Sequence, residues 1–95
     1  MTTLERAIET YGKDMQLTVA IEEFSELTKE ICKHKRGADN IDSIVEEMAD
    51  CYIMLSQLEI IFGIDYLDID SAITEKLTRL EKRLDERSKN ETNKV

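Results

Sequence analysis

Two short acidic motifs contain the side chains of this 95-residue chain that are best suited to chemistry. The first, "EEFSE", contains Glu22, Glu23 and Glu26, and the second, "EMAD", contains Glu47 and Asp50. Residues three apart on an α-helix lie about 60° apart around the axis, so the last two acids of each motif point the same way. Neither motif contains a histidine or a cysteine, and ligation by oxygen alone favours a hard cation such as Mg²⁺ or Mn²⁺ over zinc. Each motif therefore offers half of a divalent-metal site.

Helical segments must position these motifs, and the sequence predicts four of them. They are expected over about residues 3–11, about 14–35, from a start after residue 40 or 42 to about residue 62, and over about 68–87, and a glycine follows each of the first three. Asn40 or Asp42 is the expected cap of the third segment. The fold class is therefore all-α, a helical hairpin or four-helix bundle. The predicted buried stripe of the second segment is Leu17, Ala20, Ile21, Phe24, Leu27 and Ile31.

A hairpin between the second and third segments brings the two motifs to similar heights. If the chain turns near residues 37–41, the first pair lies ~17 Å before the turn and the second ~12 Å beyond it, at about 1.5 Å per residue. Two carboxylates ~6 Å apart repel by roughly 3 kcal/mol at an effective dielectric constant of 20. Asp50 also lies within the most apolar segment, where an unpaired charge is strongly disfavoured. We therefore expect a cation among Glu23, Glu26, Glu47 and Asp50.

The third segment predicts self-association. From Met48 to Phe62 its strongly polar residues are few, so apolar side chains occupy nearly every side of the helix. A helix of this kind needs cover all round, and three other helices of modest length do not supply it. We expect a homo-oligomer, with dimer and tetramer both open. A tightly wrapped monomeric four-helix bundle is the alternative.

Composition limits the classes of partner. The formal net charge is −8 and the isoelectric point is about 4.6, so a face that binds nucleic-acid polymers is not expected. No stretch approaches 18 uninterrupted apolar residues, and the first residues do not resemble a signal peptide, so we expect a cytoplasmic protein without membrane contact. The length indicates one domain over residues 1–87, and residues 88–95 are predicted to form a disordered tail.

The two motifs, separated by 20 residues, resemble the EExxE and ExxD signature of the MazG-type all-α nucleoside triphosphate pyrophosphohydrolases. The resemblance covers nearly the whole chain except its tail. It implies an oligomer of helical hairpins that converts an NTP or dNTP to the monophosphate and pyrophosphate, with Mg²⁺ as cofactor and a metal-bound water as the attacking group. It also implies the residue roles: metal ligation by Glu23, Glu26, Glu47 and Asp50, and phosphate contact by Lys76 and Arg79. For Glu22 it implies a catalytic position that either polarises water or supports the ligands.

Other functions are compatible with the same residues. Within the superfamily, phosphoribosyl-ATP is a possible substrate. A function from a different class is that of a non-catalytic acidic helical module for oligomerisation or partner binding, since the third segment has a wide apolar face and the last has a leucine stripe. The sequence leaves open the preferred base and sugar, the number of metal ions, the sharing of a site between subunits, and a housekeeping or phage-related role.

Overall fold

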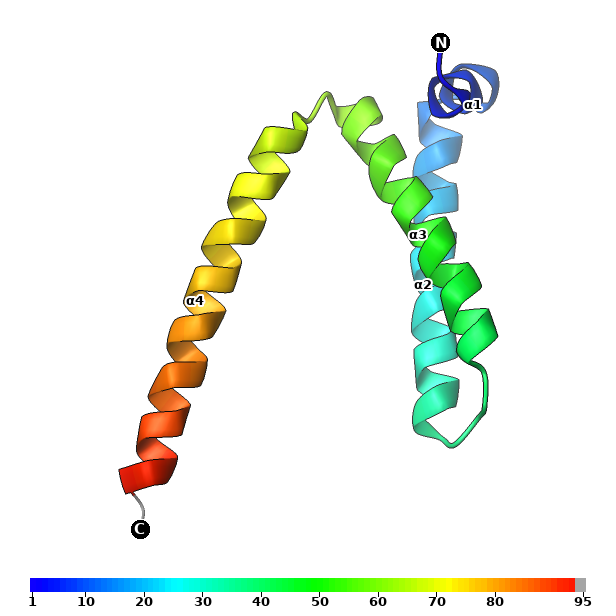
Figure 1. Ribbon diagram of the computed structural model, residues 1–95. Helices are drawn as coiled ribbons and strands as arrows, with labels where there is room; N and C mark the ends of the chain where they lie inside the picture. The colour runs from blue at the N-terminus through cyan, green and yellow to red at the C-terminus, as the bar shows by residue number, and fades with distance from the viewer. Residues whose placement is uncertain (94–95) are drawn as a thin grey trace. The chain divides into compact units, whose positions relative to one another are not determined.

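The described part of the chain folds into four α-helices, and this confirms the predicted all-α class. A computed structural model describes residues 1–93 and assigns α1 to Thr3–Tyr11, α2 to Lys13–Lys35, α3 to Ile41–Phe62 and α4 to Tyr66–Asn93 (Figure 1). Contacts divide the chain into two compact units. The first comprises Met1–Ile64 with α1, α2 and α3, and the second contains α4.

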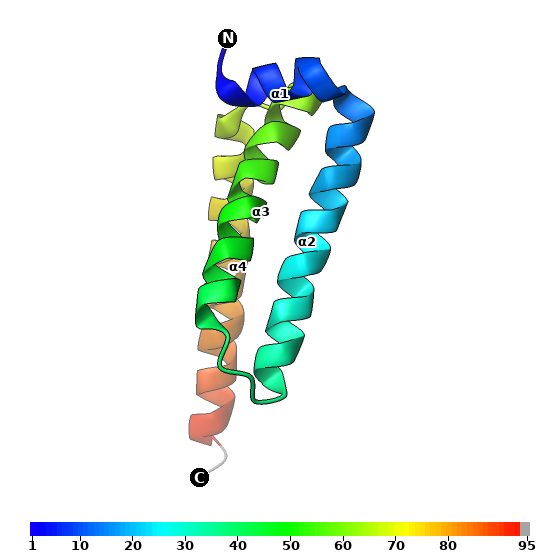
Figure 2. The same ribbon diagram turned by 90° about the vertical axis from the view of Figure 1, so that its right-hand side faces the viewer.

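Helix α1 is short, and a capping box stabilises its N-terminus. The Glu5 backbone N–H donates to Thr2 Oγ1 over 3.2 Å, and the Thr2 N–H donates to Glu5 Oε1 over 3.4 Å, which forms a capping box. Gly12 ends the helix with φ +90°, a conformation that favours glycine. The chain then turns directly into α2, so that α1 crosses one end of the hairpin and buries Ile8 (Figure 2).

Helices α2 and α3 form an antiparallel hairpin (Figure 2). The Arg36 backbone N–H donates to the Cys32 carbonyl at the end of α2, and Gly37 reverses the chain with φ +100°. Asn40 precedes α3, but its side chain makes no capping hydrogen bond. Its Nδ2 donates instead to the Glu30 backbone carbonyl over 2.9 Å. The predicted cap residue therefore holds the loop against α2.

The core of the first unit is small. Its buried hydrophobic residues are Ile8, Ala20, Cys51 and Met54, and two glutamines, Gln16 and Gln57, are buried with them. The predicted stripe of α2 was therefore too wide. Ala20 is buried, whereas Ile21 is 67% exposed and Ile31 is 46% exposed. In this unit α2 has one long neighbour, α3, which leaves the flank of the stripe uncovered.

Helix α3 is the most apolar of the helices, and much of its hydrophobic surface remains uncovered. Large hydrophobic side chains on it that remain exposed include Val45, Met48, Tyr52, Ile53 and Leu55. This exposure agrees with the expectation that α3 is apolar on nearly every side, while the oligomer itself stays a prediction. None of the helices formed by the described residues is both long enough and apolar enough to cross a membrane.

Helix α4 is a single 28-residue helix. It begins beyond an Asp65 side chain that accepts the Leu67 N–H over 2.9 Å. The predicted end at residue 87 was too early, because the helix continues to Asn93 and an Arg87–Glu91 pair at 3.2 Å supports its last turns. Residues 88–93 of the predicted disordered tail are therefore helical, and residues 94–95 lie outside the described part. The single domain over residues 1–87 stays a prediction.

Candidate metal centre

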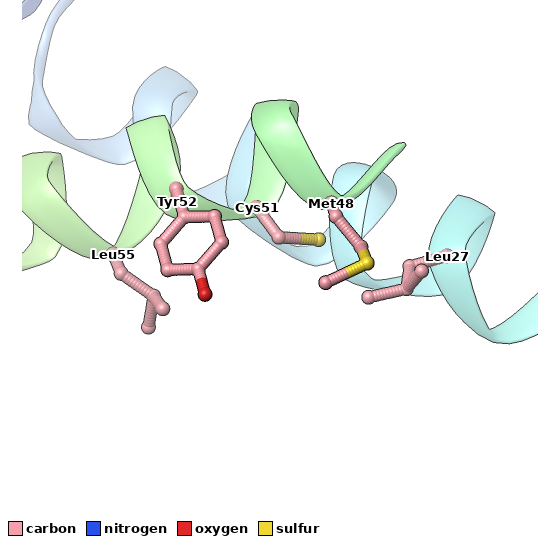
Figure 3. A pocket seen from close by; sticks show the side chains of 5 residues that line it. All are labelled: Leu27, Met48, Cys51, Tyr52 and Leu55. Carbon is pink, nitrogen blue, oxygen red and sulfur yellow. The ribbon is translucent and has the colours of Figure 1, made fainter. Parts of the chain in front are cut away.

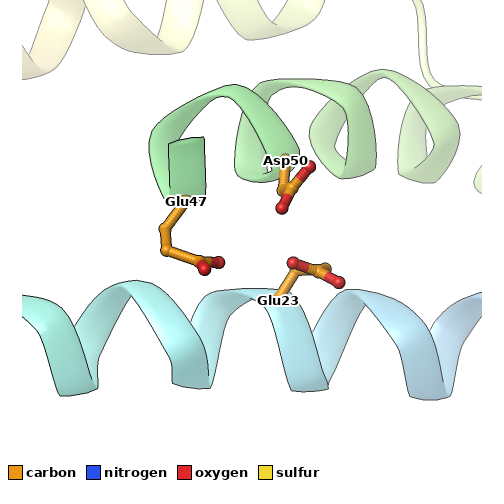
Figure 4. Close-up of side chains that lie close together, drawn as sticks. All are labelled: Glu23, Glu47 and Asp50. Atoms are coloured by element: carbon orange, nitrogen blue, oxygen red, sulfur yellow. The ribbon is translucent and has the colours of Figure 1, made fainter. Parts of the chain in front are cut away.

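Three carboxylates converge between the two helices of the hairpin. Glu23 extends from α2, while Glu47 and Asp50 extend from α3, and all three point into the space between the helices (Figure 4). Each offers one oxygen, and these oxygens lie within 4.8 Å of one another. The arrangement follows from the sequence, because Glu47 and Asp50 are three residues apart on one helix and the turn returns them to the level of Glu23.

The cluster disfavours its own negative charge. Partial burial raises the pKa of Glu23, and the charge of Asp50, a hydrogen bond with that carboxyl group, and the charges of Glu47 and Glu26 raise it further. Burial also raises the pKa of Glu47, with additional contributions from Asp50, Glu26, Glu30 and Glu46. Removal of water and repulsion by like charges both favour the protonated form, so a nearby cation would reverse the effect.

One oxygen of the cluster lacks a partner. Glu47 Oε2 is buried and accepts no hydrogen bond. The ion pairs among the described residues are Lys33–Glu30, Arg79–Glu75 and Arg87–Glu91, and none of them includes a carboxylate of the cluster. A buried acceptor without a donor costs free energy, and a carboxylate without a counter-charge costs more. A divalent cation fits this site because it would satisfy both requirements.

The remaining two acids of the first motif lie outside the group of three. Glu26 is exposed, yet it is close enough to raise the pKa of both Glu23 and Glu47. It therefore lies at the rim of the cluster. Glu22 is exposed as well, one residue or about 100° around α2 from Glu23, and the structure does not bring it into the cluster.

The two predicted phosphate contacts belong to α4. Lys76 and Arg79, together with Arg83, line a hollow of about 240 Å³ on that helix. Arg79 Nη2 lies 3.6 Å from Glu75 Oε1, four residues earlier, and both side chains are largely exposed. Contact between these cations and a triphosphate stays a prediction.

Sequence reasoning missed one neighbour of the cluster. Cys51 is buried, and its Sγ–H donates to the Glu23 backbone carbonyl over 3.5 Å, so it joins α3 to α2 beside the carboxylates. Burial raises the pKa of this thiol, and the charges of Glu23, Glu47 and Asp50 add to the effect. Its position directly after the "EMAD" motif was the available signal, because it lies four residues after Glu47 and therefore on the same helix face.

An open apolar groove of about 250 Å³ lies on the same hairpin (Figure 3). Leu27 lines it from α2, and the α3 residues that line it are Met48, Cys51, Tyr52 and Leu55. Cys51 belongs to both the groove and the surroundings of the carboxylates, so the two features adjoin. The groove lining is almost entirely apolar and offers little for binding a phosphate.

Comparisons with protein-family models, with curated proteins and with solved structures found no match. Two observations therefore remain for inferring a function of this chain: the geometry of the carboxylates and the resemblance of the two acidic motifs to the signature described above.

Proposed function

We propose that this protein is a Mg²⁺-dependent nucleoside triphosphate pyrophosphohydrolase that converts an NTP or dNTP to NMP or dNMP and pyrophosphate. The observation that carries the proposal is the convergence of Glu23, Glu47 and Asp50 from two helices, with Glu47 Oε2 buried and without a partner. The resemblance of "EEFSE" and "EMAD" to the MazG-type signature supports the same reaction.

The residues of the cluster take distinct roles in this proposal. Glu23, Glu47 and Asp50 would hold Mg²⁺, with Glu26 as the fourth ligand at the rim. When bound, Mg²⁺ supplies positive charge for the triphosphate oxygens and lowers the pKa of water. The charge of Mg²⁺ would lower the raised pKa values of Glu23 and Glu47 and keep both side chains as carboxylates.

The remaining predicted residues would act at the edge of the reaction. Lys76 and Arg79 would bind phosphate oxygens, and Glu22 would support the ligands from its neighbouring position. Water is the attacking group that fits this chain best. The sequence contains one histidine and three isolated glycines, so it offers neither a serine, histidine and acid set nor a glycine-rich phosphate loop.

Measurement of pyrophosphate release tests this function directly. The panel comprises all canonical NTPs and dNTPs, several damaged nucleotides and phosphoribosyl-ATP, each with Mg²⁺, with Mn²⁺ and with EDTA. The proposal predicts release of pyrophosphate and monophosphate that depends on metal. Activity confined to phosphoribosyl-ATP would assign the chain to that branch of the superfamily. Release that persists in EDTA would contradict the metal-dependent mechanism.

A second candidate function is favoured by the apolar groove and the exposed face of α3. A non-catalytic helical module for self-association or partner binding would bury Leu27, Met48, Tyr52 and Leu55. The enzyme hypothesis also includes a homodimer or homotetramer that covers this face. The two functions differ in their metal requirement, because the module predicts no heat on titration with Mg²⁺ and no pyrophosphate release from a folded oligomer.

A further inference from the structure

A buried pair of glutamines joins the two helices of the hairpin. Gln16 on α2 is 7% exposed and Gln57 on α3 is 3% exposed, and Gln16 Nε2 donates to Gln57 Oε1 over 3.0 Å. Most buried side chains of a small helical core are apolar, so two buried amides need a reason. Because each amide is the partner of the other, the pair is satisfied only when these two positions lie opposite each other.

The position of this pair relative to the carboxylates supplies the reason. Gln16 precedes Glu23 by seven residues, and Gln57 follows Asp50 by seven residues. Seven residues are almost two full helical turns, so each glutamine lies on nearly the same side of its helix as the corresponding acid, about 10.5 Å further along the axis. Since the helices are antiparallel, both steps lead away from the loop. The register that pairs the glutamines is therefore also the register that brings Glu23 to Asp50.

The opposite side of the cluster has an anchor of its own. Glu30 follows Glu23 by seven residues, and its backbone carbonyl accepts the hydrogen bond from Asn40 Nδ2 at the loop. The carboxylates thus lie between two polar links that join different parts of the hairpin. The loop restrains one end, and the glutamine pair is the side-chain hydrogen bond that the structure shows at the other.

Apolar contacts alone would not fix this register. A slide of α2 against α3 by about one turn would still bury apolar surface, because α3 presents Ile53, Met54 and Ile61 near Gln57. The same slide would place both amides against hydrocarbon and leave them without partners, which is strongly unfavourable in a core. A single buried amide at a coiled-coil core position specifies register in the same way.

We propose that Gln16 and Gln57 are positioning residues for the carboxylate cluster, because their hydrogen bond fixes the register of α2 against α3 and so keeps Glu23 opposite Asp50 although the acids repel one another. The part of this inference that concerns metal binding rests on the proposed function. Neither glutamine touches the cluster, so both act through the placement of the acids.

The test compares a double variant, Gln16→Leu with Gln57→Leu, with the wild-type protein. Leucine has a similar volume and removes both amides together, so no buried donor or acceptor is left alone. We expect the double variant to melt at the wild-type temperature or above it. We also expect its affinity for Mn²⁺, measured by electron paramagnetic resonance, to fall about tenfold, as is typical when a supporting residue of a metal site is lost.

Two further variants make the result specific. Met54→Leu alters a buried apolar residue of the same interface without removing an amide, so it should retain wild-type Mn²⁺ affinity. Gln16→Asn keeps an amide that is too short to reach Gln57, so it should weaken Mn²⁺ binding and it decides the question if the double variant does not fold. Wild-type Mn²⁺ affinity in the folded double variant, or in Gln16→Asn, would overturn the proposal.

Nuclear magnetic resonance reports the register of α2 against α3 without metal, so it tests this proposal independently of the proposed function. Backbone amide resonances of Glu23 and Asp50 should form a single set in the metal-free wild type and two sets, or broadened ones, in the double variant. If the wild type binds no Mn²⁺, the metal centre fails and these resonances alone decide. Doubling in the variant would then support the register role, and a single set in both proteins would contradict it.

Discussion

The α2–α3 hairpin and helix α4 are both rich in charge, yet they place it differently. Residues 1–64 contain 13 acidic and six basic residues, whereas residues 65–95 contain eight acidic and seven basic residues. On α4, acids and bases pair at i and i+4, as in Glu75 with Arg79 and Arg87 with Glu91, and these side chains are exposed. In the hairpin, Glu23, Glu47 and Asp50 converge and Glu47 Oε2 has no partner.

This difference separates an ordinary solvated helix from a candidate site. Alternating charges on a surface helix need no explanation, because each pair contributes little and water solvates the remainder. The carboxylates of the cluster have no basic partner, and their mutual repulsion raises the pKa values of Glu23 and Glu47. This repulsion disfavours the folded state, and folding alone does not require it. Such a cost suggests a role in binding or catalysis.

Removal of the convergent acids should have the largest effect. Glu47→Gln or Asp50→Asn replaces a charged carboxylate ligand by a neutral amide. Loss of a residue that only supports a metal ligand lowers activity about 10–100-fold, so loss of a ligand should lower pyrophosphate release at least about 100-fold. Release is measured with each nucleotide that the wild type hydrolyses, at saturating Mg²⁺.

Glu46→Gln is the matched control for these variants. It removes a neighbouring charge from the same helix, but the Glu46 oxygen does not belong to the group of three. Its activity should remain within a few-fold of the wild type. Full activity in Glu47→Gln and Asp50→Asn would sink the assignment of the cluster as the reactive centre.

The apolar groove of the hairpin differs from the carboxylate cluster in its expected role, which is contact between copies of the chain. Leu55→Lys places a charge in the groove, and burial of the exposed half of Leu55 in an oligomer is worth roughly 1 kcal/mol. The variant should sediment as a smaller species than the wild type in analytical ultracentrifugation. Identical sedimentation of both proteins would argue that this face is not the contact between copies.

The sequence predicted the helices and the convergence of the acids better than it predicted which hydrophobic side chains neighbouring helices bury. Helical periodicity and three glycines located α1 and α3 closely, and a short loop was sufficient to bring Glu23 near Glu47 and Asp50. The exposure of Ile21 and Ile31 was not predicted, because a pattern shows which face is apolar but not which neighbour covers it. The end of α4 was misplaced because polar residues that pair along a helix resemble a tail.

Finer features of the site depended on three-dimensional register. The sequence treated Glu23 and Glu26 as equal ligands, whereas Glu23 lies in the group of three and Glu26 lies at its rim. Helix geometry places both on one face, but their different depths depend on how α3 packs against α2. The buried pair of Gln16 and Gln57 was missed for the same reason, although the seven-residue spacing from the acids was visible.

Removal of one acid should also stabilise the metal-free protein slightly, although it should abolish metal binding. In the absence of metal, Glu23→Gln removes one of the mutually repelling charges, so the free energy of unfolding should rise by a few tenths of a kcal/mol, and by no more than about 1 kcal/mol. Chemical denaturation in EDTA measures it. If the variant is less stable than the wild type without metal, Glu23 makes a favourable contact that the cluster does not explain.

The surface pair of α4 should contribute least to stability. Arg79→Gln breaks the contact with Glu75, and the free energy of unfolding should change by no more than about 0.5 kcal/mol. The same variant should raise KM for the nucleotide if Arg79 binds phosphate. Unchanged KM would remove this residue from the proposed site while leaving the metal centre intact.

The most direct test of the metal centre is a titration of the metal-free protein with Mn²⁺, followed by the electron paramagnetic resonance signal of the free ion. Wild-type protein should remove this signal in stoichiometric amounts, and a variant combining Glu47→Gln with Asp50→Asn should not. Equal removal of the signal by both proteins, or by neither, would contradict the assignment of Glu23, Glu47 and Asp50 as a divalent-cation site.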